Sequence, residues 1–181
     1  LILGASSDMG LAFLDTLDLD NFIIGAHCYM GKKRLTNFFS KKGNKINLKI
    51  LKKNLNNQKS CRDLVHKFIK WSKGIDILIQ LTGNVSSVLS WDNLKEKDWK
   101  NDIAVNLEAP FFVSQAVFRY MKKNGGKIIL MSTASAKHGG GRTTMAYGIS
   151  KAGVEALTKG LAREGATHNI LVNAIAPGLI R

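Results

Sequence analysis

Tyr147 and Lys151 stand four residues apart in a helix-like segment, and together they could transfer a proton. Residues at this spacing lie on one face of a helix, so both side chains can reach one ligand. A cation beside a phenol favours the phenolate and lowers the phenol pKa from its reference value of roughly 10. Tyr147 could then exchange a proton with a carbonyl or an alcohol near neutral pH. An ordinary pair of solvated side chains has the same spacing.

A glycine-containing turn near the start of the chain could bind a phosphate group. An apolar run leads directly into residues 4–10, Gly-Ala-Ser-Ser-Asp-Met-Gly, which precede a helix-like segment, 11–17. Glycines at a strand-to-helix turn let the backbone approach a pyrophosphate, and the helix N-terminus supplies free N–H groups. Asp8 opposes a phosphate unless its carboxylate points to solvent or caps the helix. A structural turn capped by Ser or Asp is the alternative.

Apolar strands and amphipathic helices alternate along the chain and must position these residues. The candidate strands are 1–4, 22–26, 46–51, 75–81, 127–133 and 170–176. The candidate helices are 11–17, 61–71 with Ser60 as its N-cap, 98–122 and 146–164. Most of the strands are apolar on both faces, as buried parallel strands are. We therefore predict one α/β domain over residues 1–181, a doubly wound parallel sheet of Rossmann type with ligands at the carboxyl ends of the strands.

A proline interrupts the longest helix-like segment. Pro110 lies four residues after Asn106 and has no N–H. Within a helix the Asn106 carbonyl would lose its usual partner and would need another, such as water. A carbonyl freed in this way suits a proton relay. A simple proline kink in a surface helix is the alternative.

The 181 residues carry a formal charge of +14, and 45% of them are hydrophobic, which fits one globular domain with a sizeable core. Residues 31–60 hold ten Lys or Arg and no acidic residue. Nucleic acid is not an expected partner, because no aromatic residues alternate with the lysines as base stacking requires. The same segment is rich in Asn and Ile, so coding bias could account for part of the charge.

Other features narrow the class of protein. Cys28 and Cys61 cannot make a disulfide framework, and no Cys/His cluster suggests a metal site. The apolar runs are too short for a membrane span and no secretory signal is visible, so we expect a cytoplasmic protein with no membrane partner. The sequence opens inside an apolar run and ends just after a Pro-Gly turn. We therefore expect a domain truncated at both ends.

Several motifs in register resemble the short-chain dehydrogenase/reductase family, over essentially the whole chain. They are the loop 4–10, Val105-Asn106-Leu107, the strand 128–133, Tyr147–Lys151 with the Ala-Gly-Val that follows, and residues 172–178. In the loop, Leu3 and Asp8 stand at the Thr and middle Gly positions of the family's Thr-Gly-x-x-x-Gly-x-Gly. Residues 150–178 are most similar to reductases of 3-oxoacyl-carrier-protein type.

The resemblance implies a catalytic tetrad of Asn106, Thr133, Tyr147 and Lys151. Tyr147 would be the general acid in carbonyl reduction. Lys151 would lower the pKa of Tyr147 and hold the nicotinamide ribose. The Thr133 hydroxyl would polarise the substrate carbonyl, and Asn106 would anchor a water that links Lys151 to solvent.

This sequence departs from the family pattern in two of the motifs. Thr133 stands at the second position of the family's Ser-Ser pair, and a Thr hydroxyl can donate the same hydrogen bond. The stretch from Thr133 to Tyr147 is one residue longer than usual, so Ser132 and Ser135 also remain candidate hydroxyls. The family's Asn-Asn-Ala-Gly reads Gln-Leu-Thr-Gly at residues 80–83 and keeps only the glycine.

The resemblance also implies a nicotinamide dinucleotide cofactor. The expected contacts are Gly4, Ser6, Ser7, Met9, Gly10, Lys32, Lys33, Asn54, Leu55, Gly83, Tyr147, Lys151, Pro177, Gly178 and Ile180. At the adenine edge, Asn54 stands where the family has an acidic residue. An NAD site places Asp or Glu after the second strand, whereas an NADP site places a base. Residues 26–34 offer three bases and no acid, so we expect NADP(H) rather than NAD(H).

Lys32, Lys33 or Arg34 would then contact the 2′-phosphate, and three solvated bases are the alternative. The expected function is that of an NADP(H)-dependent oxidoreductase acting on a small carbonyl or alcohol substrate. Sugar and steroid-like alcohols remain open as substrates. A non-catalytic dinucleotide-binding sensor is the alternative function, motivated by Asp8, Leu81 and Thr133.

Two kinds of protein partner are expected. An acidic acyl-carrier protein that carries the substrate would suit a basic face, with Arg119 or Arg142 in contact. The resemblance further implies a homodimer or homotetramer, formed through the helices that start near Asp98 and Ala146. Phe111, Phe112 and Phe118 could serve that interface or belong to the core.

Overall fold

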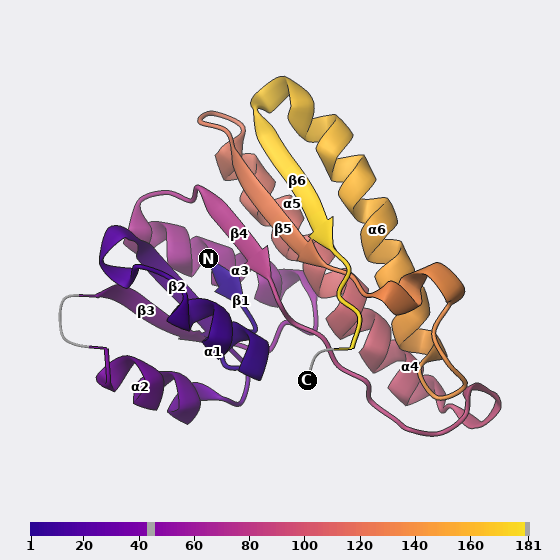
Figure 1. The fold of residues 1–181 in the computed structure, drawn as a ribbon. Helices are drawn as coiled ribbons and strands as arrows, with labels where there is room; N and C mark the ends of the chain where they lie inside the picture. Colours follow the sequence, from indigo (N-terminus) through magenta and orange to yellow (C-terminus); the bar gives the residue numbers. More distant parts are fainter. Residues whose placement is uncertain (43–45, 180–181) are drawn as a thin grey trace.

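The computed structural model describes residues 1–42 and 46–179, which form one parallel sheet with helices on both faces (Figure 1). The strands are β1 (Ile2–Leu3), β2 (Ile23–Cys28), β3 (Asn47–Lys52), β4 (Ile77–Gln80), β5 (Gly126–Met131) and β6 (Ile170–Ile175). Their order is β3-β2-β1-β4-β5-β6, and every neighbouring pair is parallel. The predicted doubly wound sheet is confirmed, and the strand order reverses between β1 and β4.

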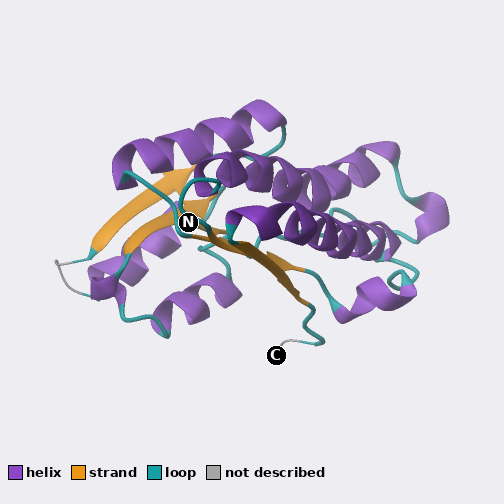
Figure 2. Ribbon diagram, turned by 90° about the horizontal axis from the view of Figure 1, so that it is seen from above, coloured by secondary structure: helices purple, strands orange, loops and turns teal. Residues whose placement is uncertain are grey.

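The helices divide between the two faces of this sheet. They are α1 (Asp8–Asp15), α2 (Lys32–Ser40), α3 (Gln58–Ser72), α4 (Glu96–Ile103), α5 (Ala109–Met121) and α6 (Met145–Gly165). Helices α1 and α2 cover one face beside β1, β2 and β3, and α3, α5 and α6 cover the other (Figure 2). Short 3₁₀ turns occupy Leu19–Asn21, Trp91–Asn93, Ala134–His138 and Ala166–His168.

Alternate strand residues supply two separate hydrophobic cores, because successive side chains of a strand point to opposite faces. In β1, Leu3 packs into the core beneath α3, α5 and α6, whereas Ile2 packs into the core beneath α1 and α2. In β4, Leu78 and Ile79 divide in the same way. This division explains why the strands read as apolar on both faces.

Helix α2 is absent from the sequence-based prediction. Its basic residues hide the pattern, but Leu35 and Phe39 lie four residues apart and are buried against the sheet. A pair at this spacing faces one side of a helix, which leaves the lysines and Arg34 on the exposed side.

The predicted N-cap of the helix after β3 is wrong. Helix α3 begins at Gln58, and Asn57 caps it from an extended backbone conformation. The Asn57 Oδ1 atom accepts a hydrogen bond from the Ser60 backbone N–H at 2.8 Å. Ser60 therefore lies inside the first turn, and Asn57 satisfies one of the N–H groups that a helix start leaves free.

The single helix predicted over residues 98–122 is also wrong, because a π-helical turn, Ala104–Glu108, separates α4 from α5. In this turn the Ala109 N–H donates to the Ala104 carbonyl, five residues back. Pro110 lies at the start of α5, where a missing N–H is tolerated. Asn106 lies in the middle of the turn and is fully buried.

Replacing the true N-cap should destabilise the fold more than replacing Ser60. We expect Asn57→Ala to lower the free energy of unfolding by about 1 kcal/mol, because a free helix N–H loses its acceptor. Ser60→Ala is the matched control, with an expected change below about 0.5 kcal/mol. Urea denaturation of both variants measures the difference, and an equal or larger loss in Ser60→Ala would contradict the assignment.

Candidate active site

The glycine loop after β1 brings backbone close to backbone. Gly4 has a φ of 73°, and a Cβ atom built on it would lie 2.9 Å from the Thr82 nitrogen at the end of β4. A Cβ atom on Gly10 would lie 2.6 Å from the Gly4 carbonyl oxygen. The Ser7 Oγ atom donates to the Gly4 carbonyl at 2.8 Å and accepts from the Gly10 N–H at 3.0 Å. The loop therefore holds the free N-terminus of α1 at the carboxyl edge of the sheet.

Asp8, the acidic residue of the glycine loop, is paired with a cation. The side chain is exposed and forms an ion pair with Arg34 of α2. This pair offsets the negative charge of Asp8. It also engages Arg34, one of the three bases that the sequence offered for a 2′-phosphate.

The start of α2 packs directly against the glycine loop. A Cβ atom built on Gly31 would lie 2.4 Å from the Ser6 Oγ atom, so these two turns are in contact. Lys32 and Lys33 form the exposed first turn of α2 beside this contact. The structure thus places both lysines next to the predicted phosphate loop.

His27, near the end of β2, supports the loop from below. Its buried ring lies between the Gly4 N–H, 3.4 Å from Nδ1, and the Lys53 carbonyl, 2.9 Å from Nε2. Burial lowers the pKa of His27, and a neutral ring protonated on Nε2 satisfies both bonds. The sequence analysis missed this residue, although a histidine in an otherwise apolar strand is a usable signal.

Three members of the predicted tetrad converge around Gly83, which follows β4. A Cβ atom built on Gly83 would lie 3.6 Å from Asn106 Oδ1, 3.7 Å from Lys151 Nζ and 3.8 Å from Tyr147 Cε2. The three side chains come from the π turn and from α6, which are far apart in the sequence. Gly83, which has no side chain, therefore lies at the centre of the candidate site.

Lys151 is a buried cation at the centre of this group. Its side chain is among the most deeply buried in the described residues, with 1% of its surface exposed. The Nζ atom donates to the Met131 carbonyl at 2.8 Å and to the Thr82 carbonyl at 3.4 Å. Burial lowers the pKa of Lys151 to about 8. Helix α6 is thus tied to the ends of β4 and β5.

The pKa of Tyr147 differs from the sequence-based expectation. Burial raises the pKa of the Tyr147 phenol above its ordinary value, whereas the sequence analysis expected Lys151 to lower it. The Lys151 Nζ atom lies over the ring, 5.5 Å from its centroid, and gives its hydrogen bonds to backbone carbonyls. Burial therefore decides the direction of the shift.

Ser132 joins β5 to α6 and is not available as the working hydroxyl. It is buried, and its Oγ atom lies 2.9 Å from Glu155 Oε1 and 3.2 Å from the Lys151 carbonyl oxygen. A serine hydroxyl has one proton to donate, and both acceptors belong to α6. Ser132 thus helps to hold the helix that carries Tyr147.

Thr133 and Ser135 remain as candidate hydroxyls beyond the end of β5. Both are half-buried, and the Ser135 N–H donates to Thr133 Oγ1 at 3.4 Å. Thr133 Oγ1 also lies 3.5 Å from the Pro177 carbonyl oxygen, which accepts from the Ala134 N–H at 2.8 Å. The segment after β6 is therefore held against the segment after β5.

A hydrogen-bonded network that the sequence analysis missed fixes Asn106. The Asn106 Nδ2 atom donates to the Asn84 carbonyl at 2.7 Å, and the Asn84 N–H donates to Asn106 Oδ1 at 2.9 Å. Buried Asp102 accepts from the Ser86 N–H at 2.8 Å and from its hydroxyl at 2.5 Å. Asp102 and Asn106 are four residues apart, which places them on the same face of a helix. This spacing of two polar residues is the feature of the sequence that could have predicted the network.

The remaining expected cofactor contacts fall in different environments. Leu55 is buried in the core beneath α3, and Asn54 is exposed after β3. Met9 is half-buried in the first turn of α1, and Gly178 is exposed after β6. Ile180 lies outside the described residues.

Two features are absent from residues 1–42 and 46–179. Within these residues, no group of three or more His, Cys, Asp or Glu side chains is placed to hold a metal ion. In the same part of the chain, no helix combines the length and the apolar character that crossing a membrane requires.

Comparisons with known proteins cover the whole chain. A family model described as short chain dehydrogenase matches residues 1–181. The 3-oxoacyl-[acyl-carrier-protein] reductase of Chlamydia pneumoniae is 39% identical over 124 residues, 66% of this chain and 48% of that protein. Nodulation protein G of Rhizobium meliloti (strain 1021) is 32% identical over 182 residues, 99% of this chain and 72% of that protein.

The chain thus spans about half the length of the first of these relatives. Among solved structures, a short-chain dehydrogenase/reductase from Serratia marcescens BCRC 10948 matches with a TM-score of 0.88 and 24% identity. The match covers 98% of this chain and 72% of that one, and it shows the same fold.

Burial of Lys151 should make stability depend on pH. Between about pH 8 and pH 10.5 the unfolded chain holds a proton that the folded chain has lost, so stability rises with pH there. Relative to Lys151→Met, the unmodified protein should gain up to about 3 kcal/mol across this window. Urea denaturation from pH 7 to pH 10 measures the gain.

Lys159→Met removes an exposed lysine from the same helix and is the matched control. A slope of the same size in this control would attribute the effect to charge alone. A Lys151→Met difference that stays level with pH would likewise contradict a buried, titrating Lys151.

Proposed function

The chain belongs to the short-chain dehydrogenase/reductase family, and from this we propose an oxidoreductase that transfers hydride between a nicotinamide dinucleotide and a carbonyl or alcohol substrate. The observation that carries the proposal is the convergence of Asn106, Tyr147 and Lys151 around Gly83. A phenol, a buried cation and a fixed amide meet there at the carboxyl edge of a doubly wound sheet. This edge is where such sheets bind ligands.

The loop between β1 and α1 fits the pyrophosphate of such a cofactor. Any side chain at Gly4 or Gly10 would strike backbone, so the loop presents main chain and the N-terminus of α1 to a ligand. The reversal of strand order between β1 and β4 adjoins this loop. When bound, a reduced nicotinamide supplies the hydride.

Tyr147 is the proposed proton donor. Its raised pKa keeps the phenol protonated at neutral pH, as a general acid in the reducing direction requires. Tyr147 Oη donates its proton to the substrate carbonyl oxygen while the carbonyl carbon accepts the hydride. One proton and one hydride thus convert the carbonyl to an alcohol, and the reverse transfers oxidise it.

Lys151 and Asn106 support this proton transfer. Below about pH 8 the Lys151 ammonium is charged, and its field stabilises the phenolate left after donation. Asn84 occupies the Asn106 amide, so Asn106 contributes its main-chain carbonyl to a water relay. Pro110 has no N–H to offer that carbonyl.

Thr133 is the proposed hydroxyl that polarises the substrate carbonyl, with Ser135 as its neighbour and alternative. Both lie at the carboxyl end of β5, and Ser132 is committed to α6. A hydroxyl donor at this position stabilises charge that develops on the carbonyl oxygen.

NADP(H) is the proposed cofactor. Lys32 and Lys33 lie beside the phosphate loop, and Arg34 is held nearby by Asp8. In the described part of the chain, no side chain caps the start of α2, so its N–H groups and dipole also favour an anion. Residues 26–34 contain no carboxylate to bind the ribose hydroxyls of NAD(H).

A thioester on an acyl-carrier protein is the proposed substrate, supported by the activity for which the Chlamydia pneumoniae relative is named. Arg142 lies in the exposed loop before α6, whose backbone bonds to Trp91 at the catalytic edge. Arg119 lies in the last turn of α5, at the end of the helix away from Asn106 and the π turn. Of the two arginines, Arg142 is therefore the better placed to contact a carrier that delivers its cargo to the site.

Self-association through α5 and α6 is also proposed. With the π turn, the two helices form a largely apolar groove, and 43% of Phe111 is exposed there. The groove is lined by Leu107, Glu108, Phe111, Phe112, Gly153 and Leu157. Exposed aromatic surface of this kind marks protein interfaces. Phe118, by contrast, is buried in the core.

Removing the Tyr147 hydroxyl should abolish turnover without abolishing cofactor binding. We expect Tyr147→Phe to lower kcat by about 10²- to 10⁴-fold, because the general acid is lost. Loss of absorbance at the nicotinamide band measures turnover with acyl thioesters and small ketones. Fluorescence titration with NADPH provides the binding control. Unchanged turnover in the variant would refute the mechanism, and NADPH binding without turnover in the unmodified protein would favour the sensor.

The cofactor preference can be read from paired titrations. We expect NADPH to bind at least about 10-fold more tightly than NADH, because a charged hydrogen bond to phosphate is strong. Lys32→Gln with Lys33→Gln should weaken NADPH and leave NADH unchanged. Lys41→Gln, beyond the far end of α2, is the matched control. Tighter binding of NADH than of NADPH would contradict the proposed cofactor preference.

A further inference from the structure

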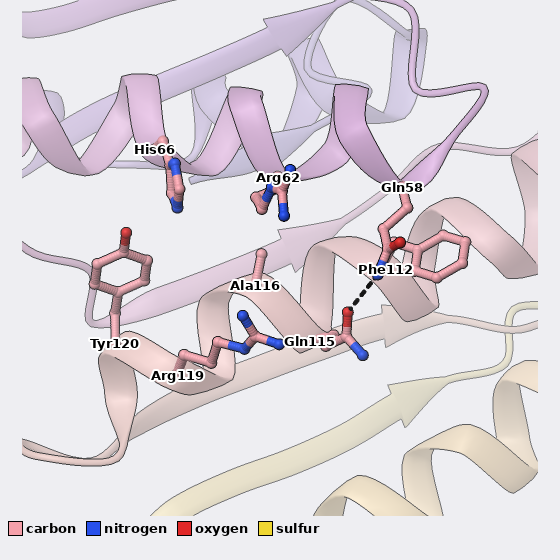
Figure 3. Close-up of a pocket in the computed structure, with 8 residues that line it drawn as sticks. All are labelled: Gln58, Arg62, His66, Phe112, Gln115, Ala116, Arg119 and Tyr120. Carbon is pink, nitrogen blue, oxygen red and sulfur yellow. Dashed lines mark hydrogen bonds between the residues drawn. The ribbon is translucent and has the colours of Figure 1, made fainter.

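A polar groove lies between α3 and α5 (Figure 3), two helices that cover the face of the sheet opposite α1 and α2. Its volume is about 260 Å³, and no residue of the candidate active site lines it. The glycine loop and Lys32 lie with α1 and α2 on the opposite face. The groove is therefore distinct from the proposed cofactor site.

Side chains of α3 and α5 meet in pairs near both ends of the groove. At one end Gln58 Nε2 donates to Gln115 Oε1 at 3.1 Å. At the other end the rings of His66 and Tyr120 meet edge to face, with centroids 6.0 Å apart. The stretch between these two pairs is the middle of the groove, and most of its lining side chains are exposed.

Two arginines occupy that middle. Arg62 of α3 and Arg119 of α5 line the same pocket from its two sides (Figure 3). Helical spacing places Arg62 four residues from both Gln58 and His66, so all three lie along one side. Ala116, a small residue on α5, leaves room beneath them.

Neither arginine is neutralised. Within residues 1–42 and 46–179 the ion pairs involve Arg34, Lys42, Lys53 and Lys100, and none of them involves Arg62 or Arg119. The pocket lining contains no carboxylate in the described part of the chain. Two positive charges that share a pocket repel each other. An anion bound between them attracts both, and these attractions outweigh the repulsion.

The donor set suits a phosphate better than a carboxylate. Each guanidinium presents a planar fork of N–H donors that matches two oxygens. Two guanidinium groups carry two positive charges, of which one carboxylate would balance only one, whereas a phosphate monoester carries a charge of about −1.5 to −2 at neutral pH and has three acceptor oxygens. The Gln115 amide nitrogen, which does not donate to Gln58, and the Tyr120 hydroxyl add neutral donors.

We propose that this groove binds a small phosphate monoester, with its phosphate between Arg62 and Arg119 and its carbon skeleton against Phe112 and Ala116. The volume lies just below the range of about 300–1,000 Å³ that holds drug-sized ligands, so the ligand is small. A compact phosphorylated metabolite fits the volume, the apolar floor and the charge.

Glycerol 3-phosphate is the probe, and calorimetric titration in saturating NADPH keeps it out of the cofactor loop. Arg62→Gln and Arg119→Gln should each weaken binding at least about 10-fold, because each removes a charge-assisted bond. Both arginines are exposed, so the fold tolerates their loss. Arg163→Gln removes an exposed arginine from α6, is the matched control and should bind as the unmodified protein does.

Two measurements distinguish a specific phosphate site from nonspecific electrostatic attraction of an anion. Arg62→Lys keeps the charge but loses the planar fork, so it should bind more weakly than the unmodified protein. Glycerol 3-phosphate should also protect Arg62 and Arg119, and not Arg163, from phenylglyoxal, as peptide mass spectrometry reports. Equal binding by the Arg62→Gln/Arg119→Gln double variant would overturn the proposal.

Tight binding of succinate, or equal affinity in Arg62→Lys, would also overturn the phosphate assignment. Sedimentation of the same variants tests the competing explanation. If the double variant dissociates an oligomer and leaves phosphate binding unchanged, the groove is a contact between copies of the chain and the proposal fails.

Discussion

The buried ammonium of Lys151 is the interaction on which the site depends. A charge in the protein interior is tolerated only where polar groups surround it, and here the carbonyls of Met131 and Thr82 supply them. Those carbonyls end two neighbouring strands, so the cation fixes the distance between the strand ends and α6. Tyr147, one helical turn earlier, is positioned by the same contact, and Ser132 reinforces it through Glu155.

A second constraint comes from the π turn between α4 and α5, which adds one residue to a helical turn. The π turn lets α4 and α5 continue in one direction while Asn106 is turned fully into the interior. Asn84 and Ser86 then pair with Asn106 and Asp102, which ties the segment after β4 to the helix. A buried carboxylate is costly unless it is hydrogen-bonded, so this network also specifies a single conformation for the loop.

Local chemistry made much of the fold predictable from the sequence. Strands that are apolar on both faces predict a covered parallel sheet, and Tyr147 and Lys151 share a helix face by spacing alone. What could not be predicted depends on neighbours distant in the sequence. The direction of the Tyr147 pKa shift follows from burial, and the orientation of Asp8 follows from Arg34, 26 residues away. Asn57 rather than Ser60 caps α3 because its backbone is extended, which composition does not reveal.

The ion pair between Asp8 and Arg34 constrains how the sequence of the glycine loop can change in evolution. An acidic residue in the first turn of α1 opposes a bound phosphate less when a neighbouring cation pairs with it. Loss of Arg34 alone would turn Asp8 into a repulsive group, whereas loss of Asp8 alone would release Arg34 beside Lys32 and Lys33. The two positions are therefore expected to vary together among descendants of this sequence, as a coupled pair beside the proposed cofactor loop.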